Sequence, residues 1–291
     1  MEQDITFLST FTGVGGFEIG FQTAIPGAKC VGVSEIDPHA CKILRYRFPE
    51  IKNYGDITKI KEEELPDFDV LCGGFPCQSF SIAGKRMGFE DTRGTLFFDL
   101  ARIVKAKKPR VLFFENVKGL LSHEEGRTIT TILQTLDGLG YDVEWQVLNS
   151  KNHGVPQNRE RIIIIGHRRE EPYKFIFPIR EETKGAIRMA RKKDEKFSQT
   201  SMVYSETGVS PTLTKSGSEN VPVAEWKRTI TINEAERLQG FPDDWTKYGI
   251  DDDGKTVEIS LRERFARMGN AVTTKVMEKV AEKILLSLES E

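Results

Sequence analysis

Short apolar runs alternate with amphipathic stretches over the first 166 residues of the chain. The apolar runs predict strands at residues 5–8, 30–34, 69–72, 111–115, 143–148 and 161–166. The stretches between them predict helices at residues 16–23, 38–48, 96–106 and 128–139. Strands that alternate with helices in this way are typical of an α/β domain built on a mainly parallel sheet.

The pattern changes after residue 166. Residues 180–196 hold mixed charges with a basic excess, and residues 198–220 are rich in Ser, Thr and Gly, which predicts irregular loops. Apolar residues then return at four-residue spacing at Val272, Val276, Val280, Ile284 and Leu288. This stripe predicts a last helix that packs back onto the first domain. We therefore expect three parts, at residues 1–166, 167–228 and 229–291.

Composition places the chain among folded proteins without a metal or membrane signature. It has 291 residues, 30% of them charged, with a formal net charge of −2. That charge gives no support to nucleic-acid binding, although a local basic lining would suffice for it. The four cysteines show no zinc spacing, the first residues are acidic, and no apolar run is as long as a membrane span. We expect a cytoplasmic protein with reduced thiols.

A glycine-rich turn follows the first predicted strand, where residues 11–17 read FTGVGGF. Such a turn lets the backbone approach a ligand, and the helix after it offers free N–H groups. Glu18 stands where the dinucleotide fingerprint needs its third glycine, so a plain tight turn explains the motif equally well. Glu35 could bind ribose hydroxyls and Asp56 an adenine amino group, although each is also explained as a helix cap or a surface charge. Together these features favour an adenosine-containing cofactor.

Cys77 lies in a loop after the strand predicted at residues 69–72, in the sequence GGFPCQSFS. Ligands of open α/β sheets bind at this end of the strands. The other cysteines suit buried packing positions, whereas a polar, glycine-flanked loop suits a reactive thiol. Glu115 ends the next apolar strand, and Arg159 and Arg161 precede another. Glu115 alone is also explained as a helix cap or an exposed strand end, and the two arginines as surface charges. A thiol, a carboxylate and two guanidiniums in one cleft, however, suit attack on an electron-poor ring.

Three of these stretches, PCQ at 76–78, ENV at 115–117 and QNRER at 157–161, resemble signature motifs of the cytosine-5 DNA methyltransferases of bacterial restriction–modification systems. Four more resemble the family's motifs in order, at residues 11–16, 93–98, 237–242 and 269–272. The resemblance covers nearly the whole chain. It implies an S-adenosylmethionine-dependent methyltransferase with a Rossmann-like fold, and a small target-recognition region at residues 167–228. The chain departs from the family at Ser9, where many members are acidic, and at Ile36, where an aromatic side chain often covers the adenine.

The resemblance also implies the roles of single residues. Cys77 is the nucleophile, Glu115 binds N3 and the amino group of cytosine, and Arg161 lies beside the ring. Asn116 holds the cleft, and Arg159 holds the DNA backbone or Glu115. The implied cofactor-binding residues are Phe11, Gly13, Gly15, Gly16, Glu35, Ile36, Asp56, Ile57, Pro76, Leu96, Asn270 and Ala271. The implied DNA-binding residues are Gln78, Ser81, Arg93, Thr212, Lys215, Ser216, Arg191, Lys192 and Lys193.

The chemistry of cytosine explains these roles. Carbon 5 is a poor nucleophile, but addition of a thiolate to carbon 6 makes it an enamine carbon that attacks an electrophilic methyl group. We expect Glu115, kept partly protonated by burial, to assist at N3. The target cytosine must flip out of the DNA duplex before it can react. Residues 78–93, with Gly84 and Gly88 as hinges, are expected to close over the flipped base. The products are the methylated base and S-adenosylhomocysteine, and the reaction needs no metal.

Two alternatives remain open. A tRNA methyltransferase of the same fold tends to carry a Cys-Phe-Thr motif in its recognition region, but this chain has no cysteine after Cys77. An inactive DNA-binding regulator would not need Cys77 and Glu115. Among DNA methyltransferases, we expect a monomer that serves a restriction–modification system or acts as an orphan enzyme. Residues 208–220 are expected to read the bases of a short target, and the basic run at residues 180–196 to hold phosphates.

Overall fold

The computed structural model describes residues 5–76, 96–180 and 228–289. It also describes the short stretches 189–191, 202–204, 210, 212–213 and 222–223.

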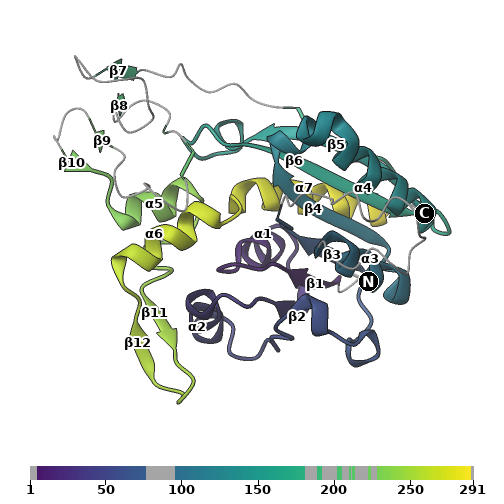
Figure 1. The fold of residues 1–291 in the computed structure, drawn as a ribbon, viewed down its shortest axis with the longest axis horizontal. Coiled ribbons are helices and arrows are strands. Elements are labelled where there is room, and N and C mark those ends of the chain that lie inside the picture. Colours follow the sequence, from purple (N-terminus) through teal and green to yellow (C-terminus); the bar gives the residue numbers. More distant parts are fainter. Residues whose placement is uncertain are drawn as a thin grey trace.

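A six-stranded sheet forms the centre of the fold, in the order β2-β1-β3-β4-β6-β5 (Figure 1). Its strands are β1 (Thr6–Thr10), β2 (Lys29–Ser34), β3 (Val70–Gly73), β4 (Val111–Val117), β5 (Tyr141–Asn149) and β6 (Glu160–Arg168). The strands β2, β1, β3 and β4 are parallel, and β6 runs antiparallel to both β4 and β5. The prediction of an α/β fold with a mainly parallel sheet is therefore confirmed.

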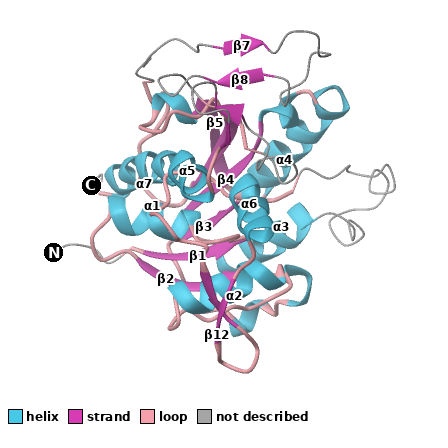
Figure 2. Cartoon of the chain, turned by 90° about the vertical axis from the view of Figure 1, so that its left-hand side faces the viewer, coloured by secondary structure: helices cyan, strands magenta, loops and turns pink. Residues whose placement is uncertain are grey.

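Helices cover both faces of this sheet (Figure 2). They are α1 (Gly16–Ala24), α2 (Pro38–Arg47), α3 (Leu96–Lys107), α4 (Arg127–Gly138) and α7 (Thr274–Leu288). Successive residues of β1 point to opposite faces, as strand geometry requires. Phe7 joins a cluster with Phe21 of α1 and Ile284 of α7, whereas Leu8 joins one with Leu100 of α3 and Ile132 of α4. The α1 and α7 helices therefore cover one face, and α3 and α4 cover the other.

The last helix packs on the first domain, as the apolar stripe predicted. Gly20 on α1 allows this contact, because a Cβ atom at that position would lie 2.5 Å from Cβ of Met277. Any larger residue at position 20 would force the two helices apart.

The remaining described elements were not predicted individually. They include α5 (Ile232–Leu238), α6 (Leu261–Asn270) and a hairpin of β11 (Tyr248–Ile250) and β12 (Thr256–Glu258), which projects from the body in Figure 1. Short strands β7 (Met189–Arg191), β8 (Met202–Tyr204), β9 (Pro222–Val223) and β10 (Arg228–Thr229) form a four-stranded sheet, where the sequence predicted loops over part of the segment. The 3-10 turns are η1 (Ile57–Lys59), η2 (Glu62–Glu64), η4 (Lys118–Leu121), η5 (His123–Gly126) and η6 (Ser150–Asn152). In the parts of the chain that the structure describes, no helix is long and apolar enough to cross a membrane.

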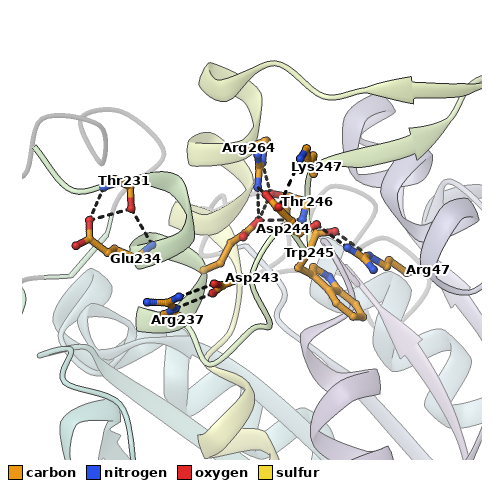
Figure 3. Close-up of polar contacts among 11 residues, drawn as sticks. Arg47, Thr231, Glu234, Arg237, Asp243, Asp244, Trp245, Thr246, Lys247 and Arg264 are labelled. Carbon is orange, nitrogen blue, oxygen red and sulfur yellow. Dashed lines mark hydrogen bonds and ion pairs between the residues drawn. The ribbon is translucent and has the colours of Figure 1, made fainter.

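Polar contacts fix the start of α5 and its place beside α6 (Figure 3). The Thr231 hydroxyl accepts from the backbone N–H of Glu234, and the Glu234 carboxylate accepts from the backbone N–H of Thr231, which is a capping box. On α6, the buried Arg264 guanidinium lies 3.1 Å from the buried Glu236 carboxylate of α5. These contacts hold the two helices together.

Glu18 is a buried carboxyl group in the first turn of α1, beside Ser9 of β1. Burial raises the pKa of Glu18 from 4.5 to about 7, although the Ser9 hydroxyl opposes this shift. An acidic residue at position 9 would place a second carboxylate next to Glu18, so the uncharged Ser9 suits this arrangement.

The raised pKa makes stability depend on pH. The folded state binds a proton more tightly than the unfolded state, so the stabilisation is complete below pH 4.5 and is lost as the pH rises to about 7. We expect the free energy of unfolding to fall over this window by on the order of 3 kcal/mol because of Glu18. Urea denaturation would measure the free energy of unfolding at pH 5 and at pH 8. The difference between these two values should be smaller for Glu18→Gln than for the wild type. An equal difference in the two proteins would mean that Glu18 does not titrate in this range.

Candidate active site

A cavity of about 410 Å³ lies at the carboxyl ends of the parallel strands. This is the edge of the sheet where open α/β folds bind ligands. The residues that line it come from the loops after β1, β2 and β3, from α2, from the end of β4, from the start of β6 and the residue before it, and from α6. They are Phe11, Gly13, Glu35, Asp37, Ala40, Gly74, Phe75, Pro76, Glu115, Asn116, Val117, Arg159, Arg161, Arg267, Gly269 and Asn270.

Glu115 and Arg161 form an ion pair at this cavity. The run of buried apolar residues in β4 ends at Glu115, so the chain delivers the carboxylate at the edge of the sheet. On the neighbouring antiparallel strand, Arg161 pairs with Val117, and the residue opposite Glu115 is Ile163. Glu115 and Arg161 are therefore diagonal neighbours on one face. The Nε atom of Arg161 lies 2.9 Å from Oε1 of Glu115, and both side chains are largely buried.

Asn116 holds the loop that leads to Cys77. Its Nδ2 group donates to the backbone carbonyl of Phe75 over 2.8 Å, and its Oδ1 atom accepts from the N–H of Val117. The side chain is buried. Because Phe75 and Pro76 are the last described residues before Cys77, this contact supports the predicted role of Asn116 in holding the cleft.

Two glycines bring the same loop close to its neighbours. A Cβ atom at Gly73 would lie 2.2 Å from Oγ1 of Thr10, which is too close for any side chain. A Cβ atom at Gly74 would lie 3.3 Å from Oε2 of Glu115. The backbone before Cys77 can therefore lie directly against β1 and against the Glu115 carboxylate.

Arg159 has a different environment from Arg161. Its guanidinium is buried and donates to the backbone carbonyls of Leu213, Gly269 and Ala271, over 3.0, 3.3 and 2.9 Å. Burial, with the nearby positive charge of Arg161, lowers the pKa of Arg159 to about 9. These described contacts go to backbone carbonyls, whereas the sequence led us to expect Glu115 or a DNA phosphate as the partner. In this structure Arg159 ties the segment at residues 212–213 and the end of α6 to the catalytic sheet.

This role predicts a loss of stability when Arg159 is truncated. We expect Arg159→Met to lower the free energy of unfolding by about 3 kcal/mol, because three carbonyls lose their donor. Arg159→Lys keeps the charge but cannot reach three acceptors in the same geometry, so it should recover only part of the loss. Urea denaturation of both variants measures this. A free energy of unfolding for Arg159→Met within 0.5 kcal/mol of the wild type, about the effect of an ordinary surface substitution, would contradict the role.

The glycine-rich turn borders the cavity through Phe11 and Gly13. Phe11, Gly13 and Gly15 all have positive φ, at 52°, 59° and 92°. No described side chain caps α1, but Gly15, Gly16 and Phe17 at its start are buried and do not line the cavity. Phe11 is a non-glycine residue in the left-handed region, a strain that is often found at functional sites.

Glu35 braces this turn from the end of β2. Its Oε2 atom accepts from the N–H of Gly13 over 2.7 Å, and its Oε1 atom accepts from the N–H groups of Ile36 and Asp37 over 2.8 Å. Burial raises the pKa of Glu35, although these three N–H groups oppose the shift. Each carboxylate oxygen has two lone pairs, so Oε2 can still accept a second hydrogen bond.

The structure brings only part of the predicted cofactor set to the cavity. Phe11, Gly13, Glu35, Pro76 and Asn270 line it. The remaining predicted residues do not appear in its lining: Gly15, Gly16, Ile36, Asp56, Ile57, Leu96 and Ala271. Among these, Ile36 is 68% exposed and Asp56 caps η1, where its Oδ1 atom accepts from the N–H and the hydroxyl of Thr58. These two contacts lower the pKa of Asp56.

Arg267 is a cavity residue that the sequence did not reveal. Its buried guanidinium bonds Oδ1 of Asp37 and lies 3.3 Å from Oε2 of Glu263. It thereby joins α6 to the loop after β2. The sequence could have indicated this role only through the spacing of Arg267 and Asn270. Residues three positions apart share a helix face, so Arg267 is expected on the same side of the helix as the predicted cofactor residue Asn270.

Several predicted residues lie outside the described part of the chain. They are Cys77, Gln78, Ser81, Arg93, Lys192, Lys193, Lys215 and Ser216, with the closing loop at 78–93 and the side chain of Arg191. Thr212 is described, and its hydroxyl donates to the backbone carbonyl of Asn158 over 2.7 Å. Next to it, Leu213 is buried. The described contacts of Thr212 and Leu213 anchor residues 212–213 to the rest of the fold. Contact of Thr212 with DNA stays a prediction.

Known proteins resemble the whole chain. The family model of C-5 cytosine-specific DNA methylases matches residues 5–202 and 181–286. The Type II methyltransferase M1.ScrFI of Lactococcus lactis subsp. cremoris is 36% identical, over 97% of this chain and 78% of that protein. M.NlaIV of Neisseria lactamica is 52% identical over 181 residues, which span 58% of this chain but only 43% of that relative. The structure of the Entamoeba histolytica methyltransferase EhMeth shares the fold, with a TM-score of 0.71 at 18% identity, over 99% of this chain and 100% of that one.

Proposed function

Because this chain belongs to the C-5 cytosine-specific DNA methylase family, we propose that it transfers a methyl group to carbon 5 of a cytosine in duplex DNA. The observation that carries the proposal is the Glu115–Arg161 pair beside Pro76 in one cavity. Pro76 directly precedes Cys77 in the sequence, so the proposal assigns the thiol to the same site as this carboxylate and guanidinium.

The proposed methyl donor is S-adenosylmethionine, which supplies an electrophilic methyl group when bound. The residues fit such a molecule. Glu35 can accept from ribose hydroxyls, and Phe11 and Gly13 of the glycine turn border the cavity. The exposed Ile36 offers an apolar cover for a base, and Asn270 also lines the cavity. Cavities of this size, a few hundred Å³, typically hold ligands of this class.

In the proposed mechanism, the Cys77 thiolate forms a bond with carbon 6 of the cytosine. The electron pair of the carbon 5–carbon 6 double bond would then be available at carbon 5 to form a bond with the methyl group, while the bond between that methyl group and the donor sulfur would break and S-adenosylhomocysteine would leave. Glu115 hydrogen-bonds N3 and the amino group, and Arg161 holds Glu115 in place and lies beside the ring. A base then removes the carbon 5 proton, the sulfur–carbon bond breaks, and the thiolate leaves.

The target cytosine is stacked in the duplex, so it must flip into the cavity. Gln78, Ser81 and Arg93, in the loop after Pro76, are proposed to contact the DNA around the flipped base. Residues 208–220, which include Thr212, Lys215 and Ser216, are proposed to read a short target. Arg191, Lys192 and Lys193 would hold phosphates. We propose a cytoplasmic monomer that acts with a restriction endonuclease or as an orphan enzyme.

Bisulfite sequencing tests this function. DNA and tRNA would be taken from a bacterial host without cytosine-5 methylation of its own DNA, which expresses the wild type or Cys77→Ser. We expect protected cytosines in one short DNA sequence in the wild type alone. Protection confined to tRNA would identify an RNA methyltransferase, and protection of neither would contradict the proposed activity.

A further inference from the structure

The peptide unit between Val14 and Gly15, in the middle of the glycine turn, is held at both ends. Its N–H group donates to the carbonyl of Thr12 over 3.2 Å. Its carbonyl accepts from the indole Nε1 of Trp245 over 2.8 Å, and these two residues lie 231 positions apart in the chain. A side chain from the C-terminal part of the molecule therefore fixes one peptide plane of the turn.

This peptide plane matters because the Glu35 carboxylate holds the N–H of Gly13, whereas the Trp245 indole holds the carbonyl of the next residue, Val14. Gly13 and Gly15 flank Val14, and both have positive φ values that glycine leaves easily. Gly13 lines the cavity directly before the Val14–Gly15 peptide, so Trp245 helps to fix the backbone of the turn where a ligand would meet it.

Trp245 is itself held firmly (Figure 3). The Arg47 guanidinium of α2 lies 4.5 Å from the centre of the indole ring. It also donates to the carbonyls of Trp245 and Asp244, over 2.8 and 2.6 Å. The rings of Phe48 and Phe241 lie 5.9 Å from the indole. The indole N–H is therefore aimed at Val14 by contacts from two separate parts of the chain.

The same segment is tied to α5 and α6. Thr246 donates both its N–H and its hydroxyl to Oε1 of the buried Glu236, over 2.9 and 2.5 Å. Arg264 of α6 donates to that carboxylate oxygen and to Asp244. The residue that orients the turn is thus connected rigidly to the helices that follow the target-recognition region.

We propose that Trp245 is a positioning residue for the cofactor, which acts by fixing the Val14–Gly15 peptide. This inference rests on the proposed function, since it takes S-adenosylmethionine as the ligand of the turn. Without the indole N–H, the turn samples other peptide orientations, and binding must select one of them. Cofactor affinity should fall, while the chemistry at Cys77 and Glu115 is unaffected once the cofactor is bound.

Trp245→Phe tests the proposal, because it removes the N–H donor and keeps an aromatic ring. Trp145→Phe is the matched control, since Trp145 lies half exposed on β5, away from the cavity. Isothermal titration at 20 °C would measure the Kd of S-adenosylmethionine for each protein. We expect about tenfold weaker binding for Trp245→Phe, about the effect of one lost buried hydrogen bond. We expect an unchanged Kd for Trp145→Phe, and a raised KM with a kcat near that of the wild type for Trp245→Phe.

The outcomes separate this inference from the proposed function. Equal affinity in Trp245→Phe and the wild type would overturn the inference, and a lowered melting temperature with an unchanged Kd would show a merely structural role. Failure of the wild type to bind S-adenosylmethionine would instead overturn the proposed cofactor. If Trp245→Phe does not fold, the Kd of S-adenosylmethionine for Arg47→Met tests the inference instead. This variant loosens the indole without removing it, and should weaken binding about threefold, part of the effect of losing the bond itself.

Discussion

We expect Cys77→Ser to lose methyl transfer by at least about 10⁴-fold, the scale on which removal of a catalytic nucleophile acts. A serine hydroxyl is much less acidic than a thiol, so it supplies too little nucleophile at neutral pH. Cofactor binding should survive, because Glu35 and the glycine turn do not depend on the thiol.

Incorporation of labelled methyl groups into duplex DNA measures this loss, and isothermal titration with S-adenosylmethionine provides the control. Transfer by Cys77→Ser at a tenth of the wild-type rate or more would rule out a thiolate adduct as the main route. Loss of both transfer and cofactor binding would point to a folding defect, and Cys77→Ala would then be tested in the same way.

Glu115→Gln should lower kcat by about 10²–10⁴-fold, the usual contribution of a positioned acid or base. Glutamine keeps the size of the side chain but cannot deliver a proton to N3. It also leaves the largely buried Arg161 without its carboxylate partner. We expect little change in the Kd of S-adenosylmethionine, since the ribose is assigned to Glu35.

Glu160→Gln provides the matched control for this variant. Glu160 lies next to Arg161 on β6 and pairs with Lys118, but its side chain is 45% exposed. It should keep nearly the wild-type kcat, because exposed ion pairs contribute little. Equal losses in Glu115→Gln and Glu160→Gln would mean that Glu115 has no special part in the chemistry.

The sheet could be predicted because its central strands, β1, β3, β4 and β6, are largely buried on both faces. The residues of β4 and β6 form unbroken apolar runs that end in Glu115 and begin near Arg161. The predicted bounds lie within three residues of those observed. The carboxyl ends of such strands meet at one edge, so Glu115 and the loop that leads to Cys77 could be assigned to one cleft from the sequence alone.

The partners of buried charges could not be predicted in the same way. Arg159 binds carbonyls 54 to 112 residues away, and Arg267 bonds Asp37 across 230 residues. Every residue has a backbone carbonyl, so the sequence does not show which carbonyls an arginine will bind. An arginine that joins segments of the fold therefore cannot be told from a phosphate-binding arginine by sequence alone. The hairpin of β11 and β12 is a different case. Its Asp253–Gly254 turn is a recognised hairpin signal that is visible in the sequence.

A covalent trap tests the central claim most directly. In duplex DNA with 5-fluorocytosine at the methylated site, the fluorine cannot leave as a proton does, so the enzyme should stay attached through Cys77. We predict a denaturation-resistant adduct that forms only with S-adenosylmethionine, and whose peptide map places the modified base on Cys77. Absence of the adduct on DNA that carries the true target, or its attachment at another residue, would contradict the account.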